Sequence, residues 1–442
     1  MRKCFFYLGA LLALGGCTTL SGDGGQTRVR DMVQQRGVSV PPPASEQHIA
    51  AMLDQPLTAE NAVSIALLNN RSLQAGYAEL SIAEADLVQA ARLPNPTFSF
   101  GRLKNGEGVE YERKLMLPVI SLLTMPITRT LEQRRFEQAQ MRTAANVLRV
   151  ADQTRRAWFG AVAAQQSAHY MEQVRSAADA GAELARRMQQ AGNWSALQQA
   201  REQAFLADAV DQLARARQTH FGEREKLVRL MGLSGEQAGF VLPERLPDLP
   251  AAPREVNDAQ EQAMANRLDI LMAQKELAGL AKSLGLTRAT RFINLLDVSY
   301  LHNATTGAHA ERAKGYEIEL EIPLFDFGTA RVAKAEAMYM QAVHNAAAGA
   351  IDARSQVREA YAGYRSAYNI ARHHRDQIVP LKKRISDEQL LRYNGMLISV
   401  FELLADAREQ VTSVNAAIEA QRDFWMADSA LNAAMTGASG PH

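Results

Sequence analysis

The chain has 442 residues, with 49 basic and 48 acidic side chains and a formal net charge of +1. This balance leaves no basic excess to neutralise phosphates, which argues against nucleic acid as a partner. Aromatic residues make up only 6%, and alanine, glutamine, glutamate, arginine and leucine dominate, which is typical of long helices rather than of several compact domains.

Residues 1–16 have the pattern of a lipoprotein signal peptide. Two basic residues precede the apolar run 5–14, which is too short to span a bilayer, and two glycines follow it. Residues 14–17 resemble a bacterial lipobox, which implies that Cys17 is acylated and becomes the first mature residue. The alternative is an ordinary signal peptide in which Cys17 is incidental. Cys4 lies inside the signal, so the mature chain has no cysteine pair for a disulfide.

Residues 17–56 are predicted to form an extended, lipid-anchored tether. They contain three glycines within 22–25 and the triplet Pro41–Pro43, which disfavour regular structure. Thr18, rather than an aspartate, follows Cys17, which favours delivery to the outer membrane. No later segment has 18 uninterrupted apolar positions, so no transmembrane helix is expected.

Apolar residues at helical spacing begin at Leu57. They predict one helix from Thr58, a suitable N-cap, down to Leu93, where two prolines follow. A second, very long helix of about 60 residues is predicted from Pro126 to Gly192, because no proline interrupts it. Helices of that length need other long helices as packing partners.

The sequence contains an internal repeat. The segments starting at Asn69 and Ala265 match, and three further short matches follow in the same order at nearly constant spacing. We therefore assign a first repeat to 57–242, a Pro-rich linker to 243–253, a second repeat to 254–437 and a tail to 438–442. Each repeat is predicted to be a helix, a β-hairpin, a very long helix, a tight turn and a long helix.

Four strands are predicted, at about 96–103, 109–117, 292–301 and 315–323. The last, "GYEIELEIP", alternates strictly between apolar and acidic residues. The preceding loop is expected to span 302–314. Strands that are apolar on one face and charged on the other suit a lipid-facing barrel. Four strands cannot close a barrel, and open edges are not tolerated in hydrocarbon, so several chains must pool their strands.

These features resemble the outer membrane efflux protein family, the TolC-like channels. The resemblance covers 57–437 and rests on "LTAENAVSIALLNNRSL", on "LPNP", on the turn at 393–395 and above all on "EIPLFDFGTARVAKAEA". The specific motif residues are Pro323, Leu324, Phe325, Asp326 and Gly328. The resemblance implies a mainly α-helical trimer whose twelve strands close one outer-membrane β-barrel, continued by a periplasmic barrel of twelve coiled-coil-like helices.

Five glutamates are candidates for the lumen of such a barrel. They lie on the charged faces of the predicted strands and would favour cations in the pore; the alternative is that these positions need only be polar. The candidates are Glu110, Glu112, Glu317, Glu319 and Glu321.

Two turns are predicted to form the periplasmic tips, each followed by a capping pattern. The resemblance implies that the tunnel closes there with acidic rings, which places Glu402 and Asp406 as gate candidates; the alternative is that Glu402 is only a helix cap. The sequence departs from the family pattern by one residue between Gly395 and Ser399, and its first tip has Gln198 in place of an acidic residue, so two acidic rings are not assured. The tip candidates are Gly192, Ser195, Gln198, Gly395, Ser399, Glu402 and Asp406.

The sequence shows no pattern of a metal site or of catalysis. His373 and His374 are adjacent, which directs them to different sides of a helix, and the basic residues around them favour a solvated face over a metal site. No nucleophile elbow, zinc-protease motif, P-loop or dinucleotide fingerprint occurs. An enzyme, a metal and a cofactor other than the lipid on Cys17 are therefore not expected.

The predicted function is that of an outer-membrane exit duct in a tripartite efflux system. The predicted partners are two further copies of the chain, a periplasmic membrane-fusion adaptor, an inner-membrane pump of resistance-nodulation-division or ABC type, and outer-membrane lipid. The alternative functions are a lipoprotein spacer without a pore, which has no use for lipid-facing strands, and a periplasmic metal-binding module. The cargo cannot be read from the sequence.

Overall fold

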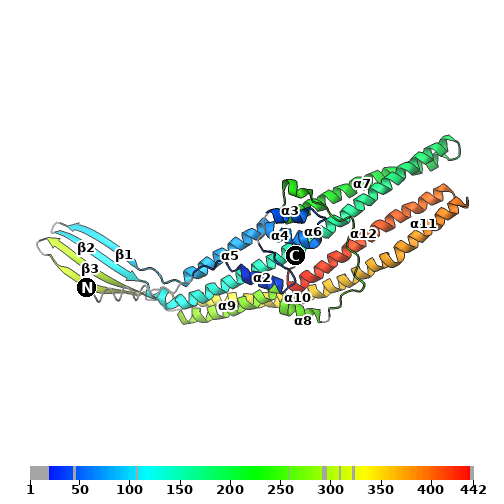
Figure 1. Cartoon of the computed structure of the whole chain (residues 1–442). Coiled ribbons are helices and arrows are strands. Elements are labelled where there is room, and N and C mark those ends of the chain that lie inside the picture. The colour runs from blue at the N-terminus through cyan, green and yellow to red at the C-terminus, as the bar shows by residue number, and fades with distance from the viewer. Residues whose placement is uncertain are drawn as a thin grey trace. The chain divides into compact units, whose positions relative to one another are not determined.

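Long helices and one four-stranded antiparallel sheet make up the chain in the computed structural model (Figure 1). The structure describes residues 19–42, 46–105, 108–256, 258–290, 296–307, 310–320 and 324–438. The chain divides into two units, each with segments from both repeats. The first comprises Met1–Val29, Gly76–Thr143 and Asp269–Ala350, and the second comprises Arg30–Ala75, Ala144–Leu268 and Ile351–His442.

The second half of the chain repeats the element order of the first, which confirms the predicted mainly helical fold with four strands. After the N-terminal helices α2 (Gln26–Gln34) and α3 (Glu46–Leu53), the first repeat contains α4 (Ala59–Asn69), α5 (Arg71–Ala90), β1 (Thr97–Asn105), β2 (Gly108–Leu117), α6 (Val119–Gln190) and α7 (Ala196–Met231). The second contains α8 (Ala259–Asn266), α9 (Leu268–Thr290), β3 (Leu296–Gly307), β4 (Arg312–Leu320), α10 (Thr329–His373), α11 (Val379–Asn394) and α12 (Val400–Thr436).

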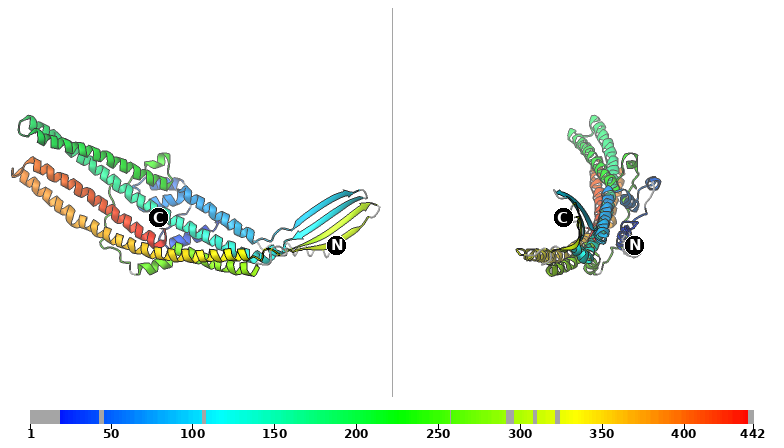
Figure 2. Two further views of the ribbon diagram at one scale, coloured as in Figure 1. Left: turned by 180° about the vertical axis from the view of Figure 1, so that it is seen from behind. Right: turned by 90° about the vertical axis from the view of Figure 1, so that its left-hand side faces the viewer.

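The helical hairpins pack through small and apolar residues. In the second unit, Met171, Val174 and Ala178 of α6 form one buried cluster with Ala209 and Leu213 of α7. Alanines in this seam let the two backbones approach closely, while the larger residues fill the gaps between them. Figure 2 shows α6–α7 and α11–α12 as antiparallel pairs, each joined by a short turn.

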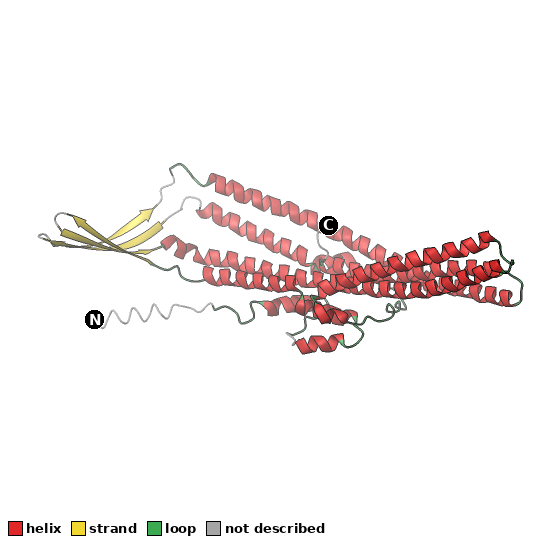
Figure 3. Cartoon of the chain, turned by 90° about the horizontal axis from the view of Figure 1, so that it is seen from above, coloured by secondary structure: helices red, strands yellow, loops and turns green. Residues whose placement is uncertain are grey.

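The prediction of an extended tether over 17–56 is wrong for the described part of this segment. Helices α2 and α3 form there (Figure 3), and Val29, Val33 and Ile49 are all buried. Gly25, at φ +77°, begins α2 so close to Phe136 that a Cβ would meet the ring at 2.6 Å. Burial of these apolar residues stabilises helices that would be too short to form alone. Cys17 lies outside the described residues.

The predicted single helix from 58 to 93 is broken at Asn70, which ends α4 and begins α5. Its side-chain oxygen accepts hydrogen bonds from the N–H groups of Ser72 and Leu73, and its side-chain nitrogen donates to the carbonyl of Leu230. The second repeat breaks at the same place, where the guanidinium of Arg267 donates to the carbonyl of Ala434. The apolar period runs through the break, so the sequence pattern did not reveal it.

Prolines do not bound the long helices as predicted. Helix α6 begins at Val119 and contains Pro126, so the expected start at Pro126 is wrong. In the second repeat a π-helical turn, His374–Ile378, joins α10 to α11, and the N–H of Val379 bonds to the carbonyl of His374. Pro380 follows immediately, and a proline that lacks an N–H is a common cause of such a widened turn.

Within the second unit, side-chain hydrogen-bond donors of α10 and α12 hold the Pro-rich linker 243–253 in place. Tyr368 Oη donates to the carbonyls of Pro250 and Ala251, and the indole of Trp425 donates to the carbonyl of Pro247. Leu249 is buried in the same cluster as Tyr368. A segment with few N–H groups cannot pair its own carbonyls, so these donors from α10 and α12 replace regular secondary structure.

The sheet has the order β1-β2-β3-β4 with antiparallel neighbours throughout. Strands β3 and β4 extend further toward their hairpin than predicted, since β3 ends at Gly307 and β4 begins at Arg312. The expected loop over 302–314 is therefore shorter. The predicted strand residues 292–295 and 321–323 lie outside the described residues.

The two helical hairpins end in the same hydrogen-bonded turn, built from different residues. In the first, the N–H of Asn193 bonds to the carbonyl of Met188 and Gly192 has φ +77°. In the second, the N–H of Leu397 bonds to the carbonyl of Arg392 and Met396 has φ 56°. Both are Schellman caps. Met396, and not Gly395, thus occupies the left-handed position, and it precedes Ser399 by three residues just as Gly192 precedes Ser195.

Replacing Met396 by glycine should stabilise the protein. A non-glycine residue in the left-handed conformation costs about 1–2 kcal/mol. Glycine avoids this cost, but its greater freedom in the unfolded chain offsets about 0.5–1 kcal/mol of the gain. We expect Met396→Gly to raise the unfolding free energy by about 0.5–1 kcal/mol, measured by thermal unfolding in detergent. The reciprocal variant, Gly192→Ala, should lower the midpoint, because no neighbour within 4 Å compensates. A lower midpoint for Met396→Gly would contradict the assignment.

Candidate functional site

The strand register sorts the residues of the sheet onto two faces. Because paired residues lie on the same face, Phe98, Leu115, Tyr300 and Tyr316 form one row across all four strands. Tyr316 is 80% exposed, so this row is uncovered in the chain. We call this side the apolar face; its apolar residues are Phe98, Phe100, Val109, Tyr111, Leu115, Leu117, Leu296, Val298, Ala304, Tyr300, Tyr316, Ile318 and Leu320.

The opposite side, the acidic face, collects carboxylates from three strands. Glu317 pairs in register with Ser299, and Glu319 with Asp297. The carboxylate of Glu317 also accepts a hydrogen bond from Lys114 Nζ at 3.0 Å. The face also holds four apolar residues, Leu103, Met116, Leu301 and Ala313. Its acidic residues are Glu110, Glu112, Asp297, Glu317 and Glu319.

Four of the five predicted glutamates therefore lie on one face, and Glu321 lies outside the described residues. Asp297 belongs with them, although the sequence analysis did not single it out. The available signal was its position between Leu296 and Val298, because strict alternation places the middle residue on the face opposite its neighbours. The sheet thus separates an apolar surface from a carboxylate-rich one.

The family motif forms the junction between the second β-hairpin and α10. The N–H of Gly328 donates to Asp326 Oδ1 at 2.8 Å, and Gly328 has φ +70°. The N–H of Val332 then bonds to the carbonyl of Gly328, which starts the helix. Leu324 and Phe325 are exposed, and Pro323 lies outside the described residues. The motif therefore has a local structural role in turning the chain.

The capping patterns predicted at the two tips are both formed. Ser195 and Gln198 make a reciprocal capping box at the start of α7, and Ser399 and Glu402 make the same box at the start of α12. Glu402 accepts the N–H of Ser399 at 3.0 Å. Asp406 lies one turn later. Its buried carboxylate oxygen Oδ2 has no hydrogen-bond partner among the described residues. Glu402 is thus engaged as a cap, and Asp406 is the uncommitted carboxylate.

A buried ion pair that the sequence did not indicate joins the two hairpins within the second unit. Glu202 of α7 is 1% exposed and accepts a hydrogen bond from Arg408 of α12 at 2.5 Å. The guanidinium of Arg408 also lies over the ring of Phe205, 4.6 Å from its centroid. A charge this deeply buried depends on its partner. The pair therefore fixes the first hairpin to the second, and Arg408 follows Asp406 by two residues on α12.

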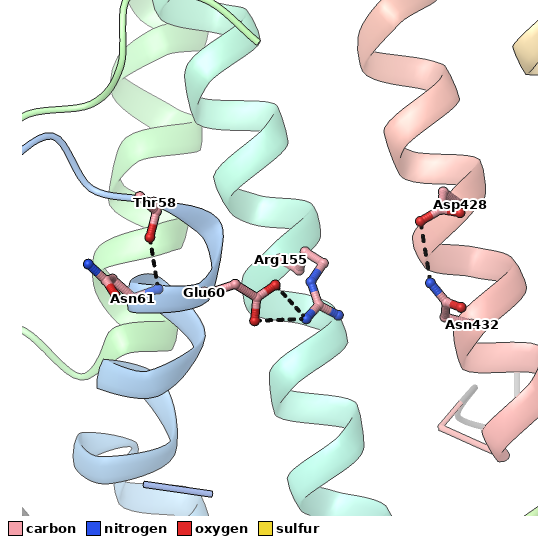
Figure 4. Close-up of polar contacts among 6 residues, drawn as sticks. All are labelled: Thr58, Glu60, Asn61, Arg155, Asp428 and Asn432. Carbon is pink, nitrogen blue, oxygen red and sulfur yellow. Dashed lines mark hydrogen bonds and ion pairs between the residues drawn. The ribbon is translucent and has the colours of Figure 1, made fainter. Parts of the chain in front are cut away.

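A charged cavity of about 400 Å³ lies in the second unit beside α4, α6 and α12. Thr58 caps α4 at its rim, and Glu60 accepts hydrogen bonds from Arg155 at 3.0 and 3.4 Å (Figure 4). Asp428 accepts a hydrogen bond from Asn432 at 3.3 Å. Burial raises the pKa of Asp428, although Arg254 and Arg155 oppose the change. Burial also raises the pKa of Asp152, which lines the same cavity.

The described ranges show no metal-binding arrangement and no membrane-crossing helix. Within them, no three histidine, cysteine, aspartate or glutamate side chains are placed to hold a metal ion together. No described helix is both long and apolar enough to traverse a lipid bilayer.

The fold is similar to that of solved outer-membrane channels, whereas comparison of the sequence with family models and curated proteins gives no match. No family model matches the chain, and no curated protein matches it. The Campylobacter jejuni CmeC outer membrane channel is similar in structure, with a TM-score of 0.73, 17% identity and 86% of each chain covered. CusC, described with respect to transmembrane channel formation, has a TM-score of 0.71 and 15% identity, with 86% of this chain and 92% of its own covered.

A third structure, the open state of the Neisseria gonorrhoeae MtrE outer membrane channel, has a TM-score of 0.69 and 16% identity, with 85% of this chain and 88% of its own covered. The likeness extends over most of each chain. The protein therefore has the TolC-like fold, as the sequence resemblance implied.

The Glu202–Arg408 pair should contribute measurably to stability. Because removing one member leaves the other charge poorly solvated, we expect Glu202→Gln and Arg408→Gln each to lower the unfolding free energy by about 1–3 kcal/mol. The double variant should cost less than the sum, because the two effects are coupled. Glu183→Gln is the matched control, since its partner Arg186 is exposed. Additive single effects would argue against the pair.

The buried aspartates of the cavity should make stability depend on pH. A carboxyl whose pKa is raised by folding binds its proton more tightly in the native state, so stability falls as the pH rises from the unfolded pKa through the folded one. We expect the double variant Asp152→Asn, Asp428→Asn to become more stable relative to the parent as the pH rises from 4 to 7. Thermal unfolding at each pH measures this difference. A constant difference across this range would contradict the raised pKa values.

Proposed function

We propose that this protein is the outer-membrane exit duct of a tripartite efflux system. The observation that carries the proposal is the separation of the sheet into an apolar face and an acidic face, both left exposed by the chain. An apolar face of four strands is costly in water, and a hydrocarbon environment would remove that cost. The acidic face would then line an aqueous pore.

Pore formation requires more than one copy of the chain. Strands β1 and β4 are the edges of the sheet, and their free N–H and C=O groups would be unsatisfied in hydrocarbon. If three copies join β4 of one to β1 of the next, twelve strands close a barrel without an edge. The family resemblance of the sequence and the TolC-like fold both support a trimer.

Within such a barrel, Glu110, Glu112, Asp297 and Glu319 would face the lumen and attract cations. Glu317 contributes less, because Lys114 neutralises it. Conduction would be passive, and no step requires a catalytic residue or a bound nucleotide. The energy would come from an inner-membrane pump of resistance-nodulation-division or ABC type, reached through a periplasmic adaptor.

The tips of the two helical hairpins are the proposed docking end and gate. Asp406, the pair Glu202–Arg408 and the cap at Glu402 lie within the first turns of α7 and α12. A partner that separates α7 from α12 would have to break a buried ion pair, which gives the closed state its resistance to opening.

The proposed anchor is a lipid on Cys17, which would hold the N-terminus at the membrane surface. One acyl signal alone binds weakly and reversibly, so the barrel would supply the stable attachment and the lipid would supply sorting. The support is the lipobox-like sequence at 14–17.

Purified protein tests the proposal directly. We expect the full-length chain to run as a trimer in detergent and to give discrete, cation-favouring conductance steps in planar bilayers. A structural spacer without a pore would give none. Both results are needed, because a trimer that does not conduct would contradict the duct.

Ile318→Arg should abolish insertion of the protein into bilayers. Ile318 is 60% exposed on the apolar face, and an arginine in the hydrocarbon costs about 2–4 kcal/mol per chain. Glu319→Arg is the matched control on the acidic face of the same strand and should insert normally, with weaker cation preference. Insertion is measured by flotation with phosphatidylcholine vesicles. Equal flotation of both variants would contradict the face assignment.

A further inference from the structure

The apolar face acquires basic residues along its strands toward the hairpin ends. In the row formed by Phe98, Leu115, Tyr300 and Tyr316 every residue is apolar or aromatic. From two residues further toward the hairpin ends, about 7 Å along the strand, basic residues stand on the same face among Phe100, Val109, Tyr111 and Ala304. The basic residues of this outer part, all exposed, are Arg102, Lys104, Arg113, Arg312 and Lys314.

The register and one side-chain contact establish that these residues share a face. Arg102 pairs with Tyr111, Lys104 with Val109, and Lys314 with His302. Arg113 Nη1 lies 3.3 Å from His302 Nδ1 on the neighbouring strand. The basic residues thus come from β1, β2 and β4 and form one patch, which we call the basic belt.

Charge is largely segregated between the two faces. At the described strand positions the apolar face has five cationic and no acidic residues, whereas the opposite face has five acidic residues and Lys114. None of the five belt residues forms an ion pair with another described residue. A surface that meets only water usually mixes both signs of charge, so a belt of one sign on the lipid-facing side indicates an anionic neighbour.

The aromatic row fixes the depth of the belt. Aromatic side chains in membrane barrels gather at the boundary between hydrocarbon and headgroups. Tyr300 and Tyr316 stand opposite each other in the last row before the belt, and two further aromatic residues, Tyr111 and Phe100, lie in the first rows of the belt with ring centroids 6.2 Å apart. The belt would therefore lie at headgroup level, where long basic side chains reach outward to phosphates.

We propose that the basic belt binds the phosphate groups of anionic lipids in the leaflet at the hairpin end of the barrel. The proposal rests on the proposed function, because it requires the apolar face to meet lipid. Arginine and lysine suit this task, since guanidinium groups can hold phosphate oxygens in pairs and ammonium groups act as point charges. Such lipids would fasten the barrel at a defined depth.

Lipid retention by the full-length protein tests the proposal. The protein is reconstituted with phosphatidylcholine and diphosphoryl lipid A, extracted in mild detergent, and the lipid bound per chain is counted by native mass spectrometry. Each basic residue near an anionic surface strengthens binding about fivefold. We expect the triple variant Arg102→Gln, Arg113→Gln, Lys314→Gln to have an apparent affinity for diphosphoryl lipid A that is at least tenfold lower. We also expect that excess inorganic phosphate does not displace the lipid bound to the parent protein.

Lys114→Gln is the matched control, because Lys114 follows Arg113 directly but belongs to the acidic face. It should retain lipid A like the parent. Equal retention by parent and triple variant would overturn the proposal, as would no preference for lipid A over phosphatidylcholine, or full displacement by inorganic phosphate.

Flotation and conductance in pure phosphatidylcholine separate this proposal from the proposed function. If the parent and the triple variant both insert and conduct there, the proposed function is supported whatever amount of lipid A each protein binds. If neither inserts, the apolar face does not meet lipid, and both proposals fail.

Discussion

The constraint on which the structure depends is the need to satisfy every backbone hydrogen-bonding group of a sheet that has one apolar face. Four strands satisfy the inner ladders, but β1 and β4 each keep one open edge. In water such a sheet would expose both its apolar face and its edges, which invites aggregation. In hydrocarbon the apolar face is favourable, and the edges become the problem. The proposed closed ring of several copies would resolve both problems.

The internal repeat shows how the same geometry can be built from different chemistry. A break between consecutive helices is held by an amide at Asn70 and by a guanidinium at Arg267, and both donate to a carbonyl at the end of the last helix of the repeat. The two hairpin turns are the same Schellman cap, with Gly192 in one and Met396 in the other. Sparse sequence identity between the repeats is therefore compatible with close structural correspondence, because backbone hydrogen bonds rather than side-chain identities define these positions.

Two structural features distinguish the second half of the chain from the first. Only the second long helix contains a π-helical turn, beside Pro380, and only the second tip carries an exposed methionine in a strained conformation. Strain of this kind persists only where the surrounding structure imposes it, and it is concentrated at functional sites. The buried pair Glu202–Arg408 joins the two halves of the chain.

The sequence alone determined the features that depend on periodicity. Alternation of apolar and charged residues defined the two faces of the sheet, since the side-chain period of a strand is fixed at two. The same pattern assigned Glu110, Glu112, Glu317 and Glu319 to one face from the sequence alone. Serine followed three residues later by glutamine or glutamate predicted both helix starts, because a capping box is a local interaction. Tertiary structure alone decided the break at Asn70, the helices within 17–56 and the Glu202–Arg408 pair. Each of these depends on a partner distant in the chain, whether the carbonyl of Leu230, the ring of Phe136 or a charge on another helix, and no local pattern encodes such a partner.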